Sequence, residues 1–136
     1  MSNKFIPHTP EDVQAMLQAI GADNIDLYSG NDDQVLPILS LGGSGVISVL
    51  SNIAPTYVHD MCEAFFNGDI DACRELQFHA LPLIEALFCE VNPIPVKAAM
   101  KLLNMDSGLL RMPLTEIEEA NMPKLKKAMD NFFKGL

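Results

Sequence analysis

The sequence predicts an α/β chain that is mostly helical, with the element order α-β-α-β-α followed by three more helices. Two short apolar segments, residues 25–30 and 45–52, each run into polar or glycine-bearing residues, as parallel strands often do at their carboxyl ends. A segment long enough for a helix separates them, and from Asp69 onward apolar residues recur at helical spacing. These patterns predict a parallel β-α-β unit followed by a helical region.

The composition is that of a folded protein with an acidic surface. Hydrophobic residues make up 49% of the 136 residues, and 18 Asp and Glu against 9 Lys and Arg give a formal net charge of −9. Such a surface repels nucleic acid phosphates and anionic lipids. No apolar run approaches the ~18 residues that a membrane-spanning helix needs, and the N-terminal residues lack the apolar stretch of a secretory signal. We therefore expect neither a nucleic acid nor a membrane as a partner.

The cysteines and histidines show no metal-binding pattern. Cys62, Cys73 and Cys89 are odd in number and widely spaced, without a CxxC pair. The three histidines share no helical face, so surface or core positions are favoured over metal ligation. We expect thiols buried in a reducing cytosol, a cytoplasmic location, and neither a metal nor another cofactor.

The first helix is predicted between Pro10 and Gly21. Thr9 can cap it, Pro10 suits the first helical position, and Glu11 favours the positive end of the helix dipole. Apolar residues from Val13 onward repeat at helical spacing, which gives one face to bury. Gly21 then ends the helix.

Residues 31–42 predict the helix between the two strands. Asp32 and Asp33 at its start suit acid–base chemistry as paired carboxylates, but residues in this position more often cap the helix that follows, and capping is favoured. The sequence GGSG at 42–45 resembles a phosphate-binding loop. It follows a helix and precedes a strand, however, so a tight turn is favoured.

The second strand, Val46–Leu50, is nearly continuous in β-branched and apolar residues, which is typical of a strand buried on both faces. Two strands are marginal in water, and their exposed edges invite further pairing. The sequence therefore predicts that this pair is part of a larger sheet.

Local signals also place the later helices. Pro55 marks the start of one helix, Asp69 caps the next, and Asn92 with Pro93 begins a third. Residues 115–133 predict a last helix, kinked or broken near Pro123. Five late methionines are predicted to fill core gaps, with an adaptable partner surface as the alternative: Met100, Met105, Met112, Met122 and Met129.

Three motifs resemble the dihydrodipicolinate synthase family. They are SGNDD at 29–33, GGSGVISV at 42–49 and NPIPVK at 92–97, in the order and spacing of that family. The resemblance covers residues 25–136 and corresponds to the final third of these pyruvate-dependent class I aldolases of lysine biosynthesis. It implies the last two β/α units of a TIM barrel followed by a C-terminal helical region.

The resemblance also implies substrate-binding residues. Ile47 matches the position on the eighth strand that lines the pyruvate site, and Gly30, Asn31 and Asp32 match the turn after the seventh strand at the rim of that site. Glycine at a strand end lets the backbone approach a small ligand closely. We expect pyruvate to be bound only when the rest of a barrel completes the site.

The same resemblance assigns no catalytic residue to this chain. The family's Schiff-base lysine, proton-relaying tyrosine and threonine pair precede the seventh strand and are not among these 136 residues. Lys97 and Lys101 fall on a late helix, where an ordinary, partly exposed side chain is expected, and Tyr28 belongs to the first strand segment. We expect the chain to be inactive alone. The resemblance indicates an aldolase family but does not decide whether this chain is an enzyme.

Residues 1–24 resemble a different protein, the opening of glycine dehydrogenase (decarboxylating) subunit 1. This predicts three parts: an N-terminal segment at 1–24, a partial barrel at 25–68 and a helical region at 69–136. The chain is thus expected to be a fragment or a chimera of an aldolase. The alternatives are a non-catalytic domain that forms homo-oligomers through open sheet edges and late helices, and a piece related to the glycine cleavage P-protein.

Overall fold

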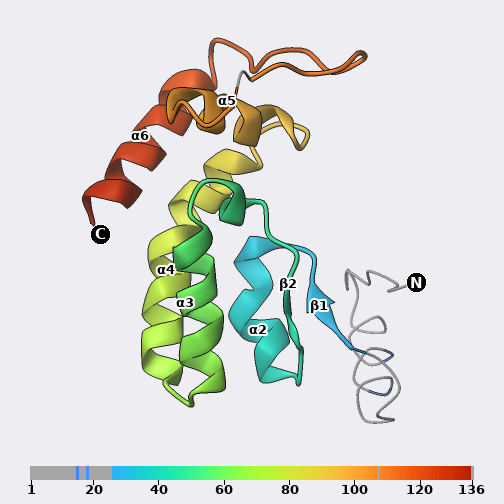
Figure 1. Cartoon of the computed structure of the whole chain (residues 1–136), viewed down its shortest axis with the longest axis vertical. Coiled ribbons are helices and arrows are strands. Elements are labelled where there is room, and N and C mark those ends of the chain that lie inside the picture. Colours follow the sequence, from blue (N-terminus) through green and yellow to red (C-terminus); the bar gives the residue numbers. More distant parts are fainter. Residues whose placement is uncertain (1–14, 16–17, 19–25, 107, 136) are drawn as a thin grey trace. The chain divides into compact units, whose positions relative to one another are not determined.

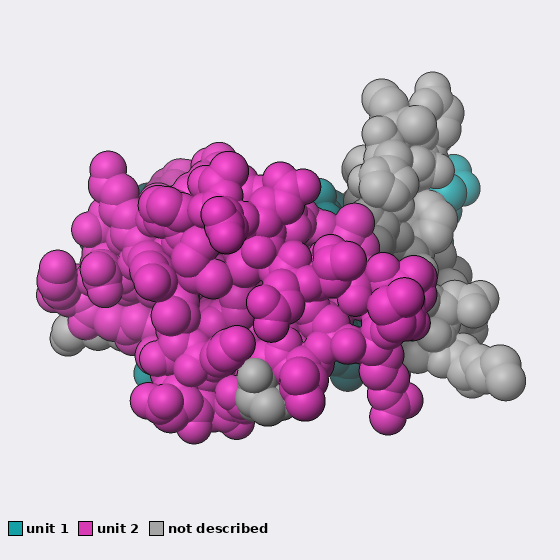
Figure 2. Space-filling model, turned by 90° about the horizontal axis from the view of Figure 1, so that it is seen from above, with its two compact units in different colours: residues 1–48, 59–77 teal, residues 49–58, 78–136 magenta. Residues whose placement is uncertain are grey.

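The computed structural model describes residues 15, 18, 26–106 and 108–135 (Figure 1). The chain divides into two compact units, distinguished in Figure 2. Unit 1 comprises residues 1–48 and 59–77, and unit 2 comprises residues 49–58 and 78–136. The predicted helix between Pro10 and Gly21 lies, except for two residues, outside the described part of the chain.

Unit 1 contains the predicted parallel β-α-β arrangement. Strands β1 (Tyr28–Ser29) and β2 (Gly45–Val46) pair in parallel, with Tyr28 opposite Gly45 and Ser29 opposite Val46. A 3-10 turn, η1 (Asp32–Gln34), and helix α2 (Val35–Ser40) connect them. In Figure 1, α2 lies beside the two strands, and buried Leu27 and Ile38 pack together with Leu41 in a hydrophobic cluster.

The GGSG sequence forms the tight turn between α2 and β2. The Gly42 N–H donates to the Leu39 carbonyl and the Gly43 N–H to the Ile38 carbonyl, both at 2.9 Å, with Gly42 at a φ of 91°. This pair of bonds is a Schellman motif, which satisfies carbonyls at the end of a helix. A Cβ at Gly43 would lie 2.7 Å from the Ile38 carbonyl oxygen, so this turn requires glycine on two counts.

The second strand is shorter than predicted. β2 ends at Val46, Ile47 is 56% exposed, and a 3-10 turn, η2 (Leu50–Asn52), occupies the end of the expected strand. The prediction that Val46–Leu50 is one strand buried on both faces is therefore wrong. The cause is non-local: β1 ends at Ser29 and the chain turns into η1, so no described segment pairs with the residues after Ile47.

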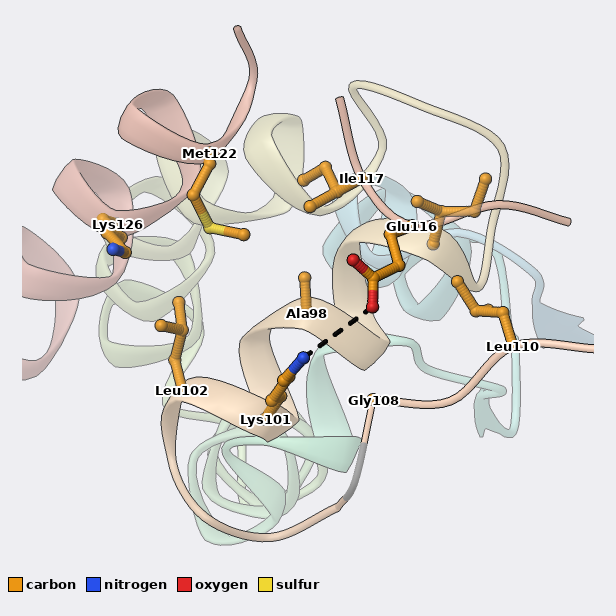
Figure 3. Close-up of a pocket in the computed structure, with 10 residues that line it drawn as sticks. Ala98, Lys101, Leu102, Gly108, Leu110, Glu116, Ile117, Met122 and Lys126 are labelled. Carbon is orange, nitrogen blue, oxygen red and sulfur yellow. Dashed lines mark ion pairs between the residues drawn. The ribbon is translucent and has the colours of Figure 1, made fainter. Parts of the chain in front are cut away.

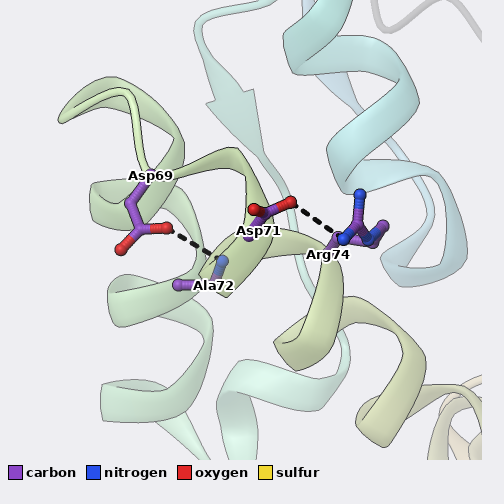
Figure 4. Close-up of polar contacts among 4 residues, drawn as sticks. All are labelled: Asp69, Asp71, Ala72 and Arg74. Carbon is purple, nitrogen blue, oxygen red and sulfur yellow. Dashed lines mark hydrogen bonds and ion pairs between the residues drawn. The ribbon is translucent and has the colours of Figure 1, made fainter.

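Helices α3 (Pro55–Phe66) and α4 (Ile70–Leu87) begin where the local signals predicted. α3 starts at Pro55, and the Asp69 carboxylate accepts a hydrogen bond from the Ala72 N–H at 3.0 Å, as an N-cap does (Figure 4). Between the helices, Gly68 has a φ of 83° and ends α3 with the same motif that ends α2. The connection therefore needs only three residues.

Unit 2 contains helices α5 (Ile94–Leu102) and α6 (Met122–Lys134). α5 begins one residue later than expected, with Pro93 as N-cap. The larger correction is that residues 115–121 are not helical and α6 begins at Met122 with Pro123 in its first turn. Proline has no N–H to donate and its ring clashes with the carbonyl four residues earlier, so it begins this helix instead of kinking it.

The core of unit 2 includes buried Leu50, Leu83, Leu87, Leu125 and Phe132. Met129 is buried among the late helices, as predicted, whereas Met105 and Met112 are exposed and do not fill the core. None of the helices in the described part of the chain is both long and apolar enough to cross a membrane.

Candidate functional site

The turn after β1 is held in place by Ser29. This residue is buried, and its hydroxyl donates to the Asn31 carbonyl at 2.7 Å while accepting a longer bond from the Asn31 N–H at 3.3 Å. A serine that bonds the backbone two residues later closes the turn locally. Gly30 and Asn31 are therefore fixed as a half-buried turn at the carboxyl end of β1.

Ile47 lies beside this turn. Its N–H donates to the Ser29 carbonyl at 2.8 Å, and the pairing of Ser29 with Val46 makes Gly30 and Ile47 the next neighbours along the sheet. Because the strands are parallel, their carboxyl ends meet at one edge. The structure thus brings Gly30, Asn31 and Ile47 together at that edge, although the Ile47 N–H is already engaged and cannot meet a ligand.

Asp32 and Asp33 do not cap the helix as predicted. Asn31 is the N-cap of η1 and Gln34 that of α2, so both aspartates lie inside the first turn. Asp33 is exposed, whereas Asp32 is only 2% exposed. One side chain is thus exposed to solvent and the other is buried. This arrangement does not favour acid–base chemistry by the two carboxylates as a pair.

Gln77 on α4 supports the turn, and the sequence interpretation missed it. Its side-chain amide donates to the Asp32 carbonyl at 2.9 Å, and its side-chain oxygen accepts from the Leu36 N–H at 3.2 Å. Gln77 is 5% exposed and follows buried Cys73 by one helical turn. The sequence signal that could have indicated this role is the position of Gln77 within a buried helical stripe. A buried polar side chain must find hydrogen-bond partners.

At the amino end of the strand pair, Gly45 and Tyr28 lie close together. Gly45 has a φ of 153°, and a Cβ there would lie 3.2 Å from the Tyr28 ring. Glycine at this position therefore lets the ring of Tyr28 cover β2 closely.

The described residues near this edge offer little for bond making. Every lysine in the described part of the chain lies on α5 or α6, and none lies on a strand. Lys97 is 32% exposed and forms an ion pair with Asp106 at 2.5 Å, so it is the ordinary, partly exposed lysine that was expected. In residues 26–106 and 108–135 no group of three His, Cys, Asp or Glu could hold a metal ion.

The thiols are not activated. Burial raises the pKa of Cys73, and the nearby Cys62 thiol raises it further. Burial first and the charge of Glu63 second raise the pKa of Cys62, and burial is also the main cause of the raised pKa of Cys89. A raised pKa leaves less of the nucleophilic thiolate at neutral pH.

Curated proteins of known function resemble this chain closely. It is 57% identical over 108 residues to the 4-hydroxy-tetrahydrodipicolinate synthase of Caldicellulosiruptor bescii, covering 79% of this chain and 37% of that protein. The corresponding enzyme of Clostridium tetani is 52% identical over 115 residues, covering 85% of this chain and 39% of that one. The chain therefore spans well under half the length of these relatives.

Solved structures agree in fold. The dihydrodipicolinate synthase of Thermotoga maritima matches 88% of this chain and 40% of its own with a TM-score of 0.82 at 37% identity. The chloride-inhibited dihydrodipicolinate synthase of Acinetobacter baumannii, crystallised with pyruvate, matches 90% of this chain and 42% of its own with a TM-score of 0.83 at 31% identity.

The fold class of these neighbours is the TIM barrel. The model of the dihydrodipicolinate synthetase family matches residues 6–132, and the chain belongs to this family. That match includes most of residues 1–24, for which a resemblance to glycine dehydrogenase was predicted; this resemblance stays a prediction.

Proposed function

We propose that this chain forms one wall of the pyruvate site of a dihydrodipicolinate synthase barrel. In this proposal, residues 25–68 are its last two β/α units and residues 69–136 its C-terminal helical region. The observation that carries the proposal is the juxtaposition of the Gly30–Asn31 turn and Ile47 at one carboxyl edge of a parallel strand pair. Active sites of TIM barrels lie at that edge.

The roles follow from the chemistry of each group. Gly30 lets the backbone approach a three-carbon acid without added bulk, and Ile47, 56% exposed here, offers an apolar surface to its methyl group. Asn31 is half-buried and Asp32 is buried at the rim, so Asn31 is the nearer polar contact and Asp32 a support for the turn. The Schiff-base lysine would come from outside residues 1–136.

The test is complementation. The purified chain is mixed with the part of the C. tetani enzyme that precedes the matched region, and pyruvate-dependent condensation with aspartate semialdehyde is measured. We expect no turnover from either part alone and measurable turnover from the mixture. Failure of the mixture, with both parts shown to be folded by circular dichroism, would reject the proposal.

A matched pair of variants checks the role of the sheet edge. Ile47→Asp replaces the apolar surface proposed for the methyl group of pyruvate with a carboxylate. It should lower turnover of the mixture at least about tenfold, because a hydrated charge disfavours the methyl group and repels the anionic substrate. Ile70→Asp changes a comparably exposed isoleucine, 43%, at the start of α4 and should leave turnover unchanged. Equal losses in both variants would remove Ile47 from the site.

The second candidate is a non-catalytic domain that associates with itself. The two-stranded sheet of the described residues and the exposed Phe66, Phe78 and Leu109 favour it, since unpaired edges and apolar surface promote association. Light scattering after size exclusion tests it: a discrete oligomer without ligand supports this candidate, and a stable monomer rejects it.

A further inference from the structure

Unit 2 contains a cavity of about 190 Å³ that has no part in the proposed pyruvate site (Figure 3). Its walls come from α5, from residues 108–117 and from the first turns of α6. Along α5, Ile94, Ala98 and Leu102 contribute apolar side chains at intervals of four residues, which places them on one helix face. Ile117 and Met122 complete the apolar lining.

Polar contacts outside the cavity hold its walls in position. Glu90 accepts a hydrogen bond from the Asn121 side chain at 2.8 Å and another from the Glu118 N–H at 3.0 Å, just before α6 begins. The ion pair between Lys97 and Asp106 joins α5 to the chain that leads into Gly108. The chain on both sides of the non-helical wall, residues 108–117, is thus tied to the rest of unit 2.

Gly108 shapes the mouth of the cavity. It is buried at a φ of 74°, and a Cβ there would lie 2.8 Å from Cδ of Lys101. The absence of a side chain lets the stem of Lys101 lie against the loop. In Figure 3 the Lys101 ammonium and the Glu116 carboxylate point toward each other, 3.8 Å apart.

The charges at the mouth favour an anion. The lining includes two lysines, Lys101 and Lys126, and a single carboxylate, Glu116. The Lys101–Glu116 contact is long and both side chains are exposed, so it contributes little and can rearrange. Lys126 is exposed and makes no ion pair within the described residues.

We propose that this cavity binds a small monocarboxylate whose apolar body is about the size of one benzene ring. The cavity is slightly larger than the ~150 Å³ apolar cavity that accommodates benzene. Ala98, Leu102 and Met122 cover the ring, and the ammonium group of Lys126 pairs with the carboxylate. The cavity shares no residue with the proposed pyruvate site. The proposal therefore gives unit 2 a binding site of its own, for an aromatic carboxylate.

The experiment titrates the full chain with phenylacetate and with phenylacetamide, its neutral counterpart of the same shape, by ligand-detected NMR. We expect saturable, millimolar binding of phenylacetate, about three- to fivefold tighter than that of the amide, as an exposed charge pair allows. Absence of saturable phenylacetate binding, or equal affinity for the amide, would overturn the proposal.

Variants locate the binding. Lys126→Gln should weaken phenylacetate binding about three- to fivefold and leave phenylacetamide binding unchanged. Lys127→Gln removes the neighbouring exposed lysine, which does not line the cavity, and should change neither ligand. Ala98→Phe should fill the cavity and abolish binding of both ligands. An equal loss of phenylacetate affinity in the two lysine variants would overturn the proposal. If Ala98→Phe does not fold, the two lysine variants still test it.

Discussion

The side-chain amide of Gln77 donates a hydrogen bond to the Asp32 carbonyl at 2.9 Å, across 45 positions of sequence. Both residues are buried, and the same Gln77 side chain accepts from the Leu36 N–H. One residue of α4 thereby fixes the turn that begins α2. The turn beside the candidate site residues is therefore supported by a residue distant in sequence.

Replacement of Gln77 should destabilise the chain through this turn. Gln77→Ala leaves the Asp32 carbonyl and the Leu36 N–H without their side-chain partner, and we expect a loss of about 1–3 kcal/mol in the free energy of unfolding. Urea unfolding followed by circular dichroism measures it. Glu75→Ala, at an exposed position on the same helix, should change stability by less than about 0.5 kcal/mol, and a similar loss in both variants would contradict this role.

Gly45→Ala should destabilise unit 1 for two reasons. The backbone φ of 153° is strained for an alanine, and the new methyl group would crowd the Tyr28 ring at 3.2 Å. We expect a cost of about 1–3 kcal/mol in thermal or urea unfolding. Gly68→Ala, at a φ of 83° with nothing within 4 Å, measures the cost of a positive φ at a site without crowding.

A double-mutant cycle then separates the two contributions at Gly45. In a Tyr28→Ala background the crowding is gone, and Gly45→Ala should cost less than in the unaltered chain. An unchanged cost would show that the contact with Tyr28 is unimportant.

The cap of α4 and the ion pair beside it should differ in strength. Asp69→Ala removes the acceptor of the Ala72 N–H and should cost about 0.5–2 kcal/mol. Asp71→Ala breaks a 2.8 Å pair with Arg74 in which both side chains are exposed, and should cost at most about 0.5 kcal/mol. Both variants lie in one helical turn (Figure 4), so chemical unfolding compares them directly.

Stability should fall at alkaline pH because of Tyr57. Burial raises the pKa of this phenol to about 12, whereas an unfolded tyrosine titrates near pH 10. Between these two values the unfolded state releases a proton that the folded state keeps, so the free energy of unfolding decreases as pH rises. The decrease is at most about 3 kcal/mol, at 1.36 kcal/mol per pKa unit.

The pH dependence of Tyr57→Phe checks the assignment. This variant should lose most of the decline between pH 10 and 12 in urea unfolding. Tyr28→Phe, which changes a 39% exposed tyrosine, should retain it. A decline that persists in Tyr57→Phe would assign the alkaline transition to other groups.

The helix ends at Pro55, Asp69 and Gly42 were predictable from sequence, because caps, prolines and left-handed glycines act within one turn of the chain. The β-α-β order was predictable from the two short apolar segments and the helix-length segment between them. The three motifs at residues 29–33, 42–49 and 92–97 indicated the family, whose model matches residues 6–132. The binding roles of Gly30, Asn31, Asp32 and Ile47 are proposals that the complementation experiment tests.

The extent of β2 could not be predicted locally, because a strand lasts only as long as its partner runs beside it and β1 ends at Ser29. The sequence also predicted that the last helix begins at residue 115, whereas α6 begins at Met122. Here Pro123 was a local signal for the correct start. The role of Gln77 depends on contacts more than 40 residues away. Short-range backbone chemistry thus sets where helices begin and end, whereas strand length and support of the turn after β1 are decided only when distant segments pack.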